Sequence, residues 1–88
     1  MKHKKYFDEL IAILLKIKTE TEMSAFLSAL LTPQESEQLP KRIQIIKMLK
    51  QGLPQREISE KLNVGIATVT RGTKELKSNH FKNIEVPK

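Results

Sequence analysis

The sequence predicts an all-α protein, and two observations carry this prediction. Apolar residues recur at three- and four-residue spacing in successive segments of the 88-residue chain, which is the period of a helix that buries one face. Capping residues, prolines and glycines separate these segments where helices would begin and end. β-Branched residues between Val64 and Thr73 could indicate a strand, but the spacing of Ile66, Val69 and Leu76 fits a helix better.

The first two helices are predicted from their apolar stripes. The first runs from about Lys5 to Lys18, and the second is short and begins after Thr21, whose hydroxyl is suited to cap its amino end. The stripe residues are Phe7, Leu10, Ile11, Leu14 and Ile17 in the first helix and Phe26, Leu27, Leu30 and Leu31 in the second.

A third helix is predicted from Thr32 to about Gln51. Thr32 can cap it, a proline follows at the first helical position, and Glu35 can complete a capping box. Gly52 is expected to end the helix in a left-handed conformation. Pro40 removes one helical hydrogen bond at a cost of about 3 kcal/mol, so we expect a kink or a broken turn near Gln38. The predicted inward stripe is Leu39, Ile43, Ile46 and Leu49.

The last two helices are predicted over residues 55–62 and 66–77. Asn63, which tolerates a positive φ, and Gly65 supply the turn between them. The polar residues that follow are expected to hold one weak turn around Phe81 and Ile84.

Chain length, cysteine content, apolar runs and net charge exclude some classes of function and favour others. A chain of 88 residues buries a small fraction of its surface, which favours a partner subunit. There is no cysteine, hence neither a disulfide nor a thiolate metal site. The longest apolar run, Leu10 to Leu15, is too short to span a bilayer, and the start of the chain lacks the pattern of a signal peptide, so we expect a cytoplasmic protein without membrane contact. The net charge of +6 favours a polyanionic partner such as nucleic acid.

Residues 55–76 have the pattern of a helix-turn-helix, in which two helices cross steeply around a tight turn. Ile58, Leu62, Val64 and Val69 fall where the helices touch, with Ile58 and Leu62 facing inward, and the small Ser59 falls where they approach most closely. An ordinary helical hairpin would share these features, so the exposed residues must decide between the two.

The exposed residues of this segment favour a DNA-binding helix-turn-helix over an ordinary helical hairpin. The start of the last helix carries small and hydroxyl side chains that can approach base edges or thymine methyl groups in a major groove. Nearby side chains supply the hydrogen-bond donors and positive charge that duplex DNA requires. The predicted DNA-binding residues are Gln55, Arg56, Ile66, Ala67, Thr68, Thr70, Lys74 and Lys77.

The string Gly65-Ile66-Ala67-Thr68-Val69-Thr70-Arg71-Gly72, preceded by Gln55-Arg56-Glu57-Ile58 and by Leu31-Thr32-Pro33, resembles the bacterial tryptophan repressor family. The resemblance covers roughly Leu30 to Lys77. It implies a sequence-specific transcriptional repressor, an all-α intertwined homodimer whose helix-turn-helix motifs enter successive major grooves of a palindromic operator. The chain would then be a single domain, residues 1–88, with dimerisation helices over 5–52, the helix-turn-helix over 53–77 and a short tail over 78–88.

The resemblance also implies a corepressor, L-tryptophan or a close relative, and no other cofactor. The amino acid would lie between the third helix of one chain and the recognition helix of the other, and would set the angle of the reading helices. Arg42 and Arg71 would flank the indole ring, and Arg71 would also pair with the ligand carboxylate. Thr32 and the backbone near it would meet the ligand's carboxylate and amino groups, while Gly72 would leave room for the ring. The implied corepressor-binding residues are Ala29, Leu31, Thr32, Arg42, Arg71, Gly72 and Glu75.

Four features depart from the family pattern. Glu75 stands where the family has a small hydroxyl residue, and its carboxylate could accept the indole proton, reject the ligand or pair with Arg71 one helical turn earlier. Pro40 falls within the helix that carries Arg42. The connection Gly52-Leu53-Pro54 is one residue short, and the segment after the last helix is too brief for the family's final helix.

Two alternatives remain beside the tryptophan-dependent repressor. One is a regulator of the same fold that binds DNA without an amino acid, because an Arg71–Glu75 contact fills the pocket. The other is a helical protein-interaction module. We expect no enzyme: no nucleophile–base pair is apparent, the three glycines form no phosphate-binding loop, and neither His3 nor His80 has a cysteine or a nearby carboxylate at metal-ligand spacing.

Overall fold

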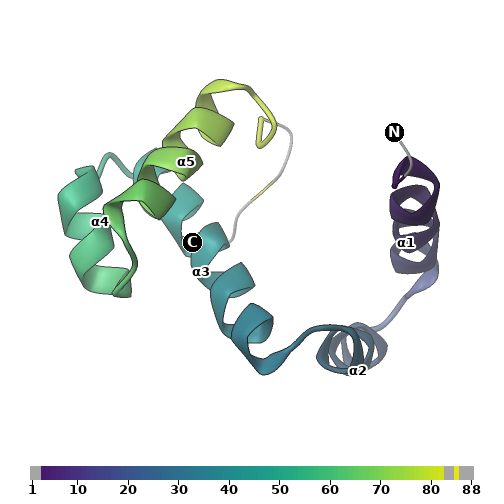
Figure 1. The fold of residues 1–88 in the computed structure, drawn as a ribbon. Helices are drawn as coiled ribbons and strands as arrows, with labels where there is room; N and C mark the ends of the chain where they lie inside the picture. The colour runs from purple at the N-terminus through teal and green to yellow at the C-terminus, as the bar shows by residue number, and fades with distance from the viewer. Residues whose placement is uncertain (1–2, 83–84, 86–88) are drawn as a thin grey trace. The chain divides into compact units, whose positions relative to one another are not determined.

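The computed structural model describes residues 3–82 and residue 85, and within them the chain forms five helices and no strand (Figure 1). This confirms the all-α prediction. The helices are α1 (Lys4–Lys16), α2 (Glu20–Leu30), α3 (Pro33–Lys50), α4 (Gln55–Leu62) and α5 (Ile66–Lys77). The chain divides into two compact units, residues 1–36 and residues 37–88. No helix in the described part of the chain is long and apolar enough to cross a membrane.

The N-terminal unit holds α1 and α2, neither of which contains a buried residue. The start of α2 differs from the prediction, because Thr19 and not Thr21 is its N-cap. Thr19 is extended (φ −119°, ψ 153°), and its hydroxyl accepts a hydrogen bond of 3.1 Å from the backbone N–H of Glu22. Starting there places Glu20 and Glu22 in the first turn, where carboxylates interact favourably with the helix dipole.

The capping box predicted at the start of α3 is confirmed. The Thr32 backbone N–H donates to Oε1 of Glu35 at 2.9 Å, and the Glu35 N–H donates to Oγ1 of Thr32 at 3.1 Å. Hydrogen bonds from Thr32, first of all from its backbone, hold the pKa of the Glu35 carboxyl below its ordinary value.

Of the kink or broken turn predicted near Gln38, the broken turn is absent, because α3 continues as a helix through Pro40, and the kink stays a prediction. A proline removes a single donor, the one that would bond to the carbonyl of Ser36, and α3 is helical on both sides of it. The capped first turn before Pro40 and the buried residues after it hold both flanks in helical conformation.

The inward stripe of α3 was only partly predicted. Ile46 is buried as expected, but its neighbour Ile45, which the stripe omitted, is just as inaccessible, at 1% exposed. Leu39 and Ile43, assigned to the stripe, are 39% and 40% exposed. Adjacent residues on a helix point about 100° apart, so burial of both isoleucines requires neighbours on two sides.

The end of α3 is a Schellman motif centred on Gly52. Its φ of 86° is left-handed, as predicted, and glycine adopts that conformation without steric penalty. The backbone N–H of Gly52 donates to the Leu49 carbonyl at 3.0 Å, and the N–H of Leu53 donates to the Met48 carbonyl at 3.1 Å. These two bonds satisfy carbonyls that the helix end would leave unpaired.

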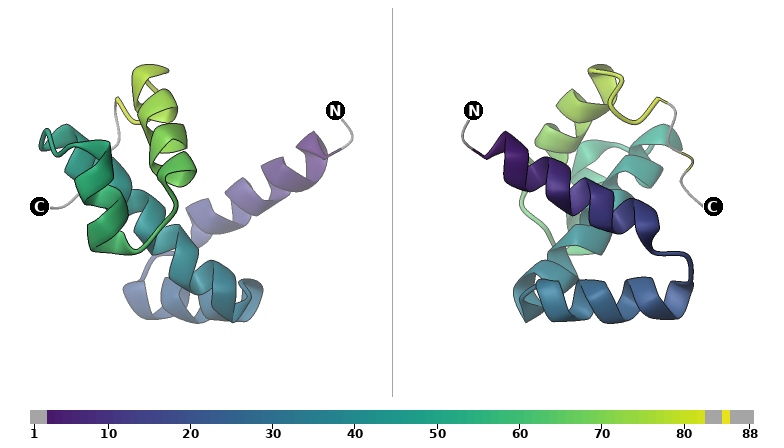
Figure 2. Two further views of the ribbon diagram at one scale, coloured as in Figure 1. Left: turned by 60° about the vertical axis from the view of Figure 1, so that its left-hand side comes forward. Right: turned by 90° about the vertical axis from the view of Figure 1, so that its right-hand side faces the viewer.

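The core of the C-terminal unit lies where α4 and α5 pack beside the later part of α3 (Figure 2). Ile45, Ile58 and Val69 form this core, one residue from each helix. Leu62 and Val64 are partly buried against it, as the helix-turn-helix pattern predicted. The other partly buried contacts are Met48, Leu49 and Leu53.

After α5 the chain enters a turn that includes Asn79, whose φ of 67° is left-handed. The Lys82 N–H donates to the Asn79 carbonyl at 3.1 Å and closes this turn. Phe81 lies in it as predicted, whereas Ile84, the other residue of the predicted turn, is outside the described residues.

Candidate nucleic-acid interface and ligand pocket

The turn between α4 and α5 is held by local contacts. Asn63 takes the predicted left-handed conformation (φ 53°, ψ 52°), which ends α4. The Ser59 hydroxyl donates to the carbonyl of Val64 at 2.6 Å, so this residue is hydrogen-bonded to the turn in addition to being small. With Ile58 and Val69 both fully buried beside the turn, the two helices are held in one relative orientation.

The start of α5 is open to solvent. Ile66 is 51% exposed although it is a large apolar residue, and Ala67, Thr68 and Thr70 are also exposed. An exposed isoleucine beside small and hydroxyl side chains is suited to contact with thymine methyl groups and base edges.

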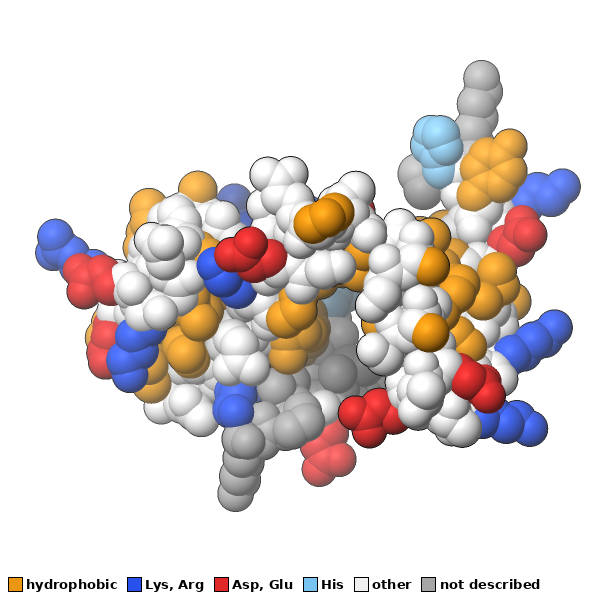
Figure 3. All heavy atoms as spheres, turned by 90° about the horizontal axis from the view of Figure 1, so that it is seen from below, with side chains coloured by type: hydrophobic (Ala, Val, Ile, Leu, Met, Phe, Trp, Pro, Cys, Tyr) orange, Lys and Arg blue, Asp and Glu red, His pale blue; other side chains and the backbone are white. Residues whose placement is uncertain are grey.

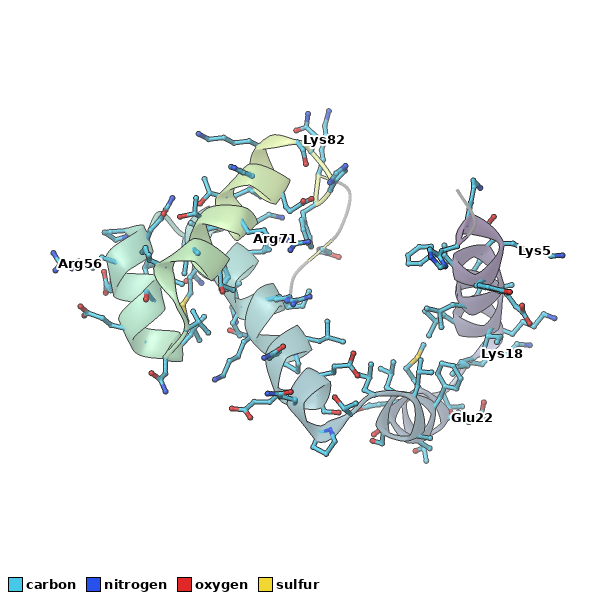
Figure 4. All side chains as sticks on the ribbon, viewed as in Figure 1. Lys5, Lys18, Glu22, Arg56, Arg71 and Lys82 are labelled. Carbon is cyan, nitrogen blue, oxygen red and sulfur yellow. The ribbon has the colours of Figure 1, made fainter. Side chains whose placement is uncertain are left out.

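The predicted basic residues are also at the surface. Arg56, Lys74 and Lys77 are exposed, and Arg56 extends outward from α4 (Figure 4). In the described part of the C-terminal unit, the salt bridges of lysine are Lys41–Glu37 and Lys61–Glu57, and His80 lies beside Glu75. No described carboxylate therefore forms a salt bridge with Arg56, Lys74 or Lys77. Unpaired cations are available to phosphate groups.

Gln55 differs from the other predicted DNA-binding residues because its side chain is hydrogen-bonded to residues of α5. Its Nε2 donates to Oγ1 of Thr73 at 3.0 Å, and its Oε1 accepts from Oγ1 of Thr70 at 3.0 Å. Gln55 therefore aligns the start of α4 with the middle of α5. The sequence interpretation missed Thr73, which shows its role only once the two helices are placed side by side.

A pocket of about 330 Å³ lies between α3, α5 and the turn that follows α5. Four of the predicted corepressor-binding residues line it, and Figure 4 labels one of them, Arg71, on α5. The lining residues are Arg42, Ile45, Ile46, Thr68, Arg71, Gly72, Glu75 and Phe81. The structure differs here from the expectation that the third helix and the recognition helix around one ligand come from different chains, since Arg42 and Arg71 meet in a single chain.

The other three predicted ligand residues belong to the N-terminal unit. Ala29 and Thr32 are exposed and Leu31 is half-buried, at the junction of α2 and α3. The sequence did not indicate that Ile45, Ile46 and Phe81 line a pocket, because packing alone is a sufficient explanation for an apolar residue at each of these positions.

Gly72 has a packing role that the sequence interpretation missed. A Cβ atom at this position would lie 2.7 Å from Cγ2 of Ile45 and 3.6 Å from Cδ1 of Leu49. Glycine therefore allows α5 to approach α3 closely, in addition to lining the pocket.

Glu75 is half-buried, and the side chain that it contacts is not the one considered from the sequence. Nδ1 of His80 lies 2.6 Å from its Oε2, and no ion pair with Arg71 occurs within the described part of the chain. The Arg71–Glu75 contact considered for filling the pocket is thus not formed among the described residues, and the sequence did not indicate that His80 lies beside Glu75. A turn after α5 brings the histidine back, which helical spacing does not predict. No group of three or more metal-ligating side chains occurs among the described residues.

Comparisons with known proteins show which family this chain resembles. The sequence profile of the family described as "Trp repressor protein" matches residues 5–84. A Trp operon repressor homolog of Aliivibrio salmonicida (strain LFI1238) is 42% identical over 78 residues, covering 85% of this chain and 72% of the relative.

Two Vibrio proteins match a shorter region. The Trp operon repressor homolog of Vibrio cholerae (serotype O1, strain El Tor Inaba N16961) is 57% identical over 53 residues, 59% of this chain and 52% of the relative. That of Vibrio campbellii is 55% identical over 53 residues, 59% of this chain and 53% of the relative. These alignments span about half the length of the Vibrio relatives, and no solved structure gives a significant match. The chain belongs to the Trp repressor family, whose members are DNA-binding transcription regulators and not enzymes.

Proposed function

We propose that this chain represses transcription as a homodimer that binds operator DNA when loaded with L-tryptophan. The observation that carries the proposal is that α5 contributes residues both to the pocket and to the exposed surface proposed to contact DNA. Arg71, Gly72 and Glu75 line the pocket, while Ile66, Ala67 and Thr70 are exposed at the start of the same helix. A ligand in the pocket therefore acts on the helix that would enter the groove.

The chemistry of the pocket suits an aromatic amino acid. Arg42 and Arg71 offer planar cations for an aromatic face and a carboxylate, and Ile45 and Ile46 supply apolar wall. Glu75 provides an acceptor for a ring N–H or an amino group. Ala29, Leu31 and Thr32 remain the predicted contacts for the ligand's carboxylate and amino groups.

Coupling between ligand and DNA follows from linkage. L-Tryptophan can strengthen operator binding only by fitting better to the orientation of α5 that reaches the DNA. Gly72, which lets α5 pack closely on Ile45, makes that orientation sensitive to what lies between α5 and α3.

A second copy of the chain is expected to cover the N-terminal unit. Tyr6, Phe7 and Leu15 are 69%, 60% and 79% exposed in α1, and Leu30 in α2 is 51% exposed. Figure 3 shows hydrophobic side chains open at the surface of the right-hand part, which holds α1 and α2. Two amphipathic helices with no buried residue are stable when an identical partner buries them.

Sedimentation equilibrium tests the dimer. The molar mass is expected to be twice the 10.1 kDa of one chain at micromolar concentration. Leu15→Asp should shift the chain toward the monomer, because it places a charge on the proposed interface, whereas Lys16→Asp beside it should leave the mass unchanged. A monomeric wild-type chain would contradict the dimer.

DNA binding is tested by titrating a fluorescent duplex of mixed sequence at several salt concentrations. For Lys77→Ala, the slope of log K against log salt is expected to fall by about 1 for each Lys77 in the complex, because one phosphate contact is lost. Lys18→Ala, which removes the same charge from the N-terminal unit, is the matched control and should keep the wild-type slope. If the wild-type chain shows no binding and no slope, it acts instead as a protein-interaction module.

A further inference from the structure

The turn after α5 is joined to both helices that border the pocket. His80 Nδ1 and Glu75 Oε2, 2.6 Å apart, connect it to α5. On the other side, Nζ of Lys50 at the end of α3 donates to the carbonyl oxygen of Phe81 over a longer distance of 3.5 Å. The turn itself is closed by the Lys82–Asn79 backbone bond. The contact of Lys50 with Phe81 and that of Glu75 with the neighbouring His80 thus hold Phe81 close to both helices.

The Phe81 side chain is half-buried and lines the same pocket as Arg42 and Arg71. With the phenylalanine in place the pocket still measures about 330 Å³. Small-molecule sites fall at about 300–1,000 Å³, so the remaining space is enough for a small ligand. Phe81 is therefore a wall of the pocket and does not fill it.

We propose that Phe81 is a specificity-determining residue of the ligand site, and that it contacts the aromatic ring of the bound amino acid. This inference rests on the proposed function. Two aromatic rings attract each other in offset or edge-to-face arrangements, beyond the apolar area that they bury. The pocket then presents two guanidinium groups and one aromatic ring to its ligand, a combination that favours an aromatic amino acid over an aliphatic one.

Calorimetry with L-tryptophan tests the inference. Phe81→Ala is expected to raise the Kd roughly tenfold, the effect of losing one aromatic pair and part of its buried area. Phe81→Tyr keeps the ring and should stay within about twofold of the wild type. Lys82→Ala, the matched control, alters the neighbouring residue, which does not line the pocket, and should bind like the wild type.

A spectroscopic readout separates a contact from a general effect on folding. The chain contains no tryptophan, so selective excitation reports the ligand alone. The emission of bound L-tryptophan is expected to shift to the red in Phe81→Ala, because the indole ring loses an apolar neighbour and gains water. Phe81 lies outside the buried core of Ile45, Ile58 and Val69, so the thermal midpoint without ligand should fall less than in Ile58→Ala.

The outcomes distinguish this inference from the proposed function. If the wild-type chain gives no heat with L-tryptophan, both the corepressor role and this inference are overturned. If the wild type binds L-tryptophan and Phe81→Ala binds it with the same Kd and the same emission, the inference about Phe81 alone is overturned.

Discussion

Replacing Arg71 by alanine is expected to abolish the effect of L-tryptophan on DNA binding. Arg71 lines the pocket from α5 and is the proposed partner of the ligand carboxylate. A hydrogen bond to a charged group contributes about 1.5–3 kcal/mol, so its loss weakens ligand binding by roughly 10- to 150-fold. Calorimetry measures the loss directly, and DNA titration with and without L-tryptophan measures its consequence.

Two companion variants show what the guanidinium does. Arg71→Lys keeps the charge but loses the planar fork, and should recover only part of the affinity. Lys61→Ala removes one positive charge from α4 at a position that does not line the pocket, and should respond to L-tryptophan like the wild type. A wild-type response in Arg71→Ala would show that the ligand binds elsewhere.

Replacing Ile58 by alanine is expected to lower the free energy of unfolding by about 2–5 kcal/mol, the range for truncating a buried isoleucine. Ile58 is fully buried between Ile45 and Val69 in the small core of the C-terminal unit. Because small domains are stable by only about 5–15 kcal/mol, the variant should unfold at a much lower urea concentration. Circular dichroism during urea titration, at one fixed protein concentration, measures the free energy of unfolding and the urea midpoint of both proteins.

Ile66→Ala is the matched control for this experiment. It removes the same atoms from a residue of the same unit that is 51% exposed, and surface substitutions usually change stability by less than about 0.5 kcal/mol. Equal destabilisation of the two variants would mean that Ile58 does not hold α4 on α3 and α5. The same control variant is expected to weaken DNA binding, because Ile66 begins the proposed reading helix.

Features that depend on neighbouring residues were predictable from the sequence. The bounds of α4 and α5, the capping box of Thr32 and Glu35 and the left-handed Gly52 all match their predictions. Each of them follows from residues within about five positions, where backbone geometry and short polar side chains leave few choices. The N-cap of α2 was misassigned because Thr19 and Thr21 are chemically equivalent, and only the observed backbone conformation distinguishes them.

The resemblance to a known family supplied what local patterns could not. Arg42 and Arg71 are separated by 28 intervening residues, and no periodicity connects them. The structure places both of them at one pocket of a single chain, and their role in binding a ligand stays a prediction.

The sequence by itself determined the helices of this protein, the turn that joins α4 to α5 and the exposed basic character of its last helix. Only the tertiary structure decided that Ile45 is buried, that Gly72 packs on it, that Glu75 pairs with His80 and that Phe81 lines the pocket. These contacts depend on how closely α3 and α5 approach and on the direction of the turn after α5. Both are set by the summed packing of many side chains, which no single stretch of sequence encodes.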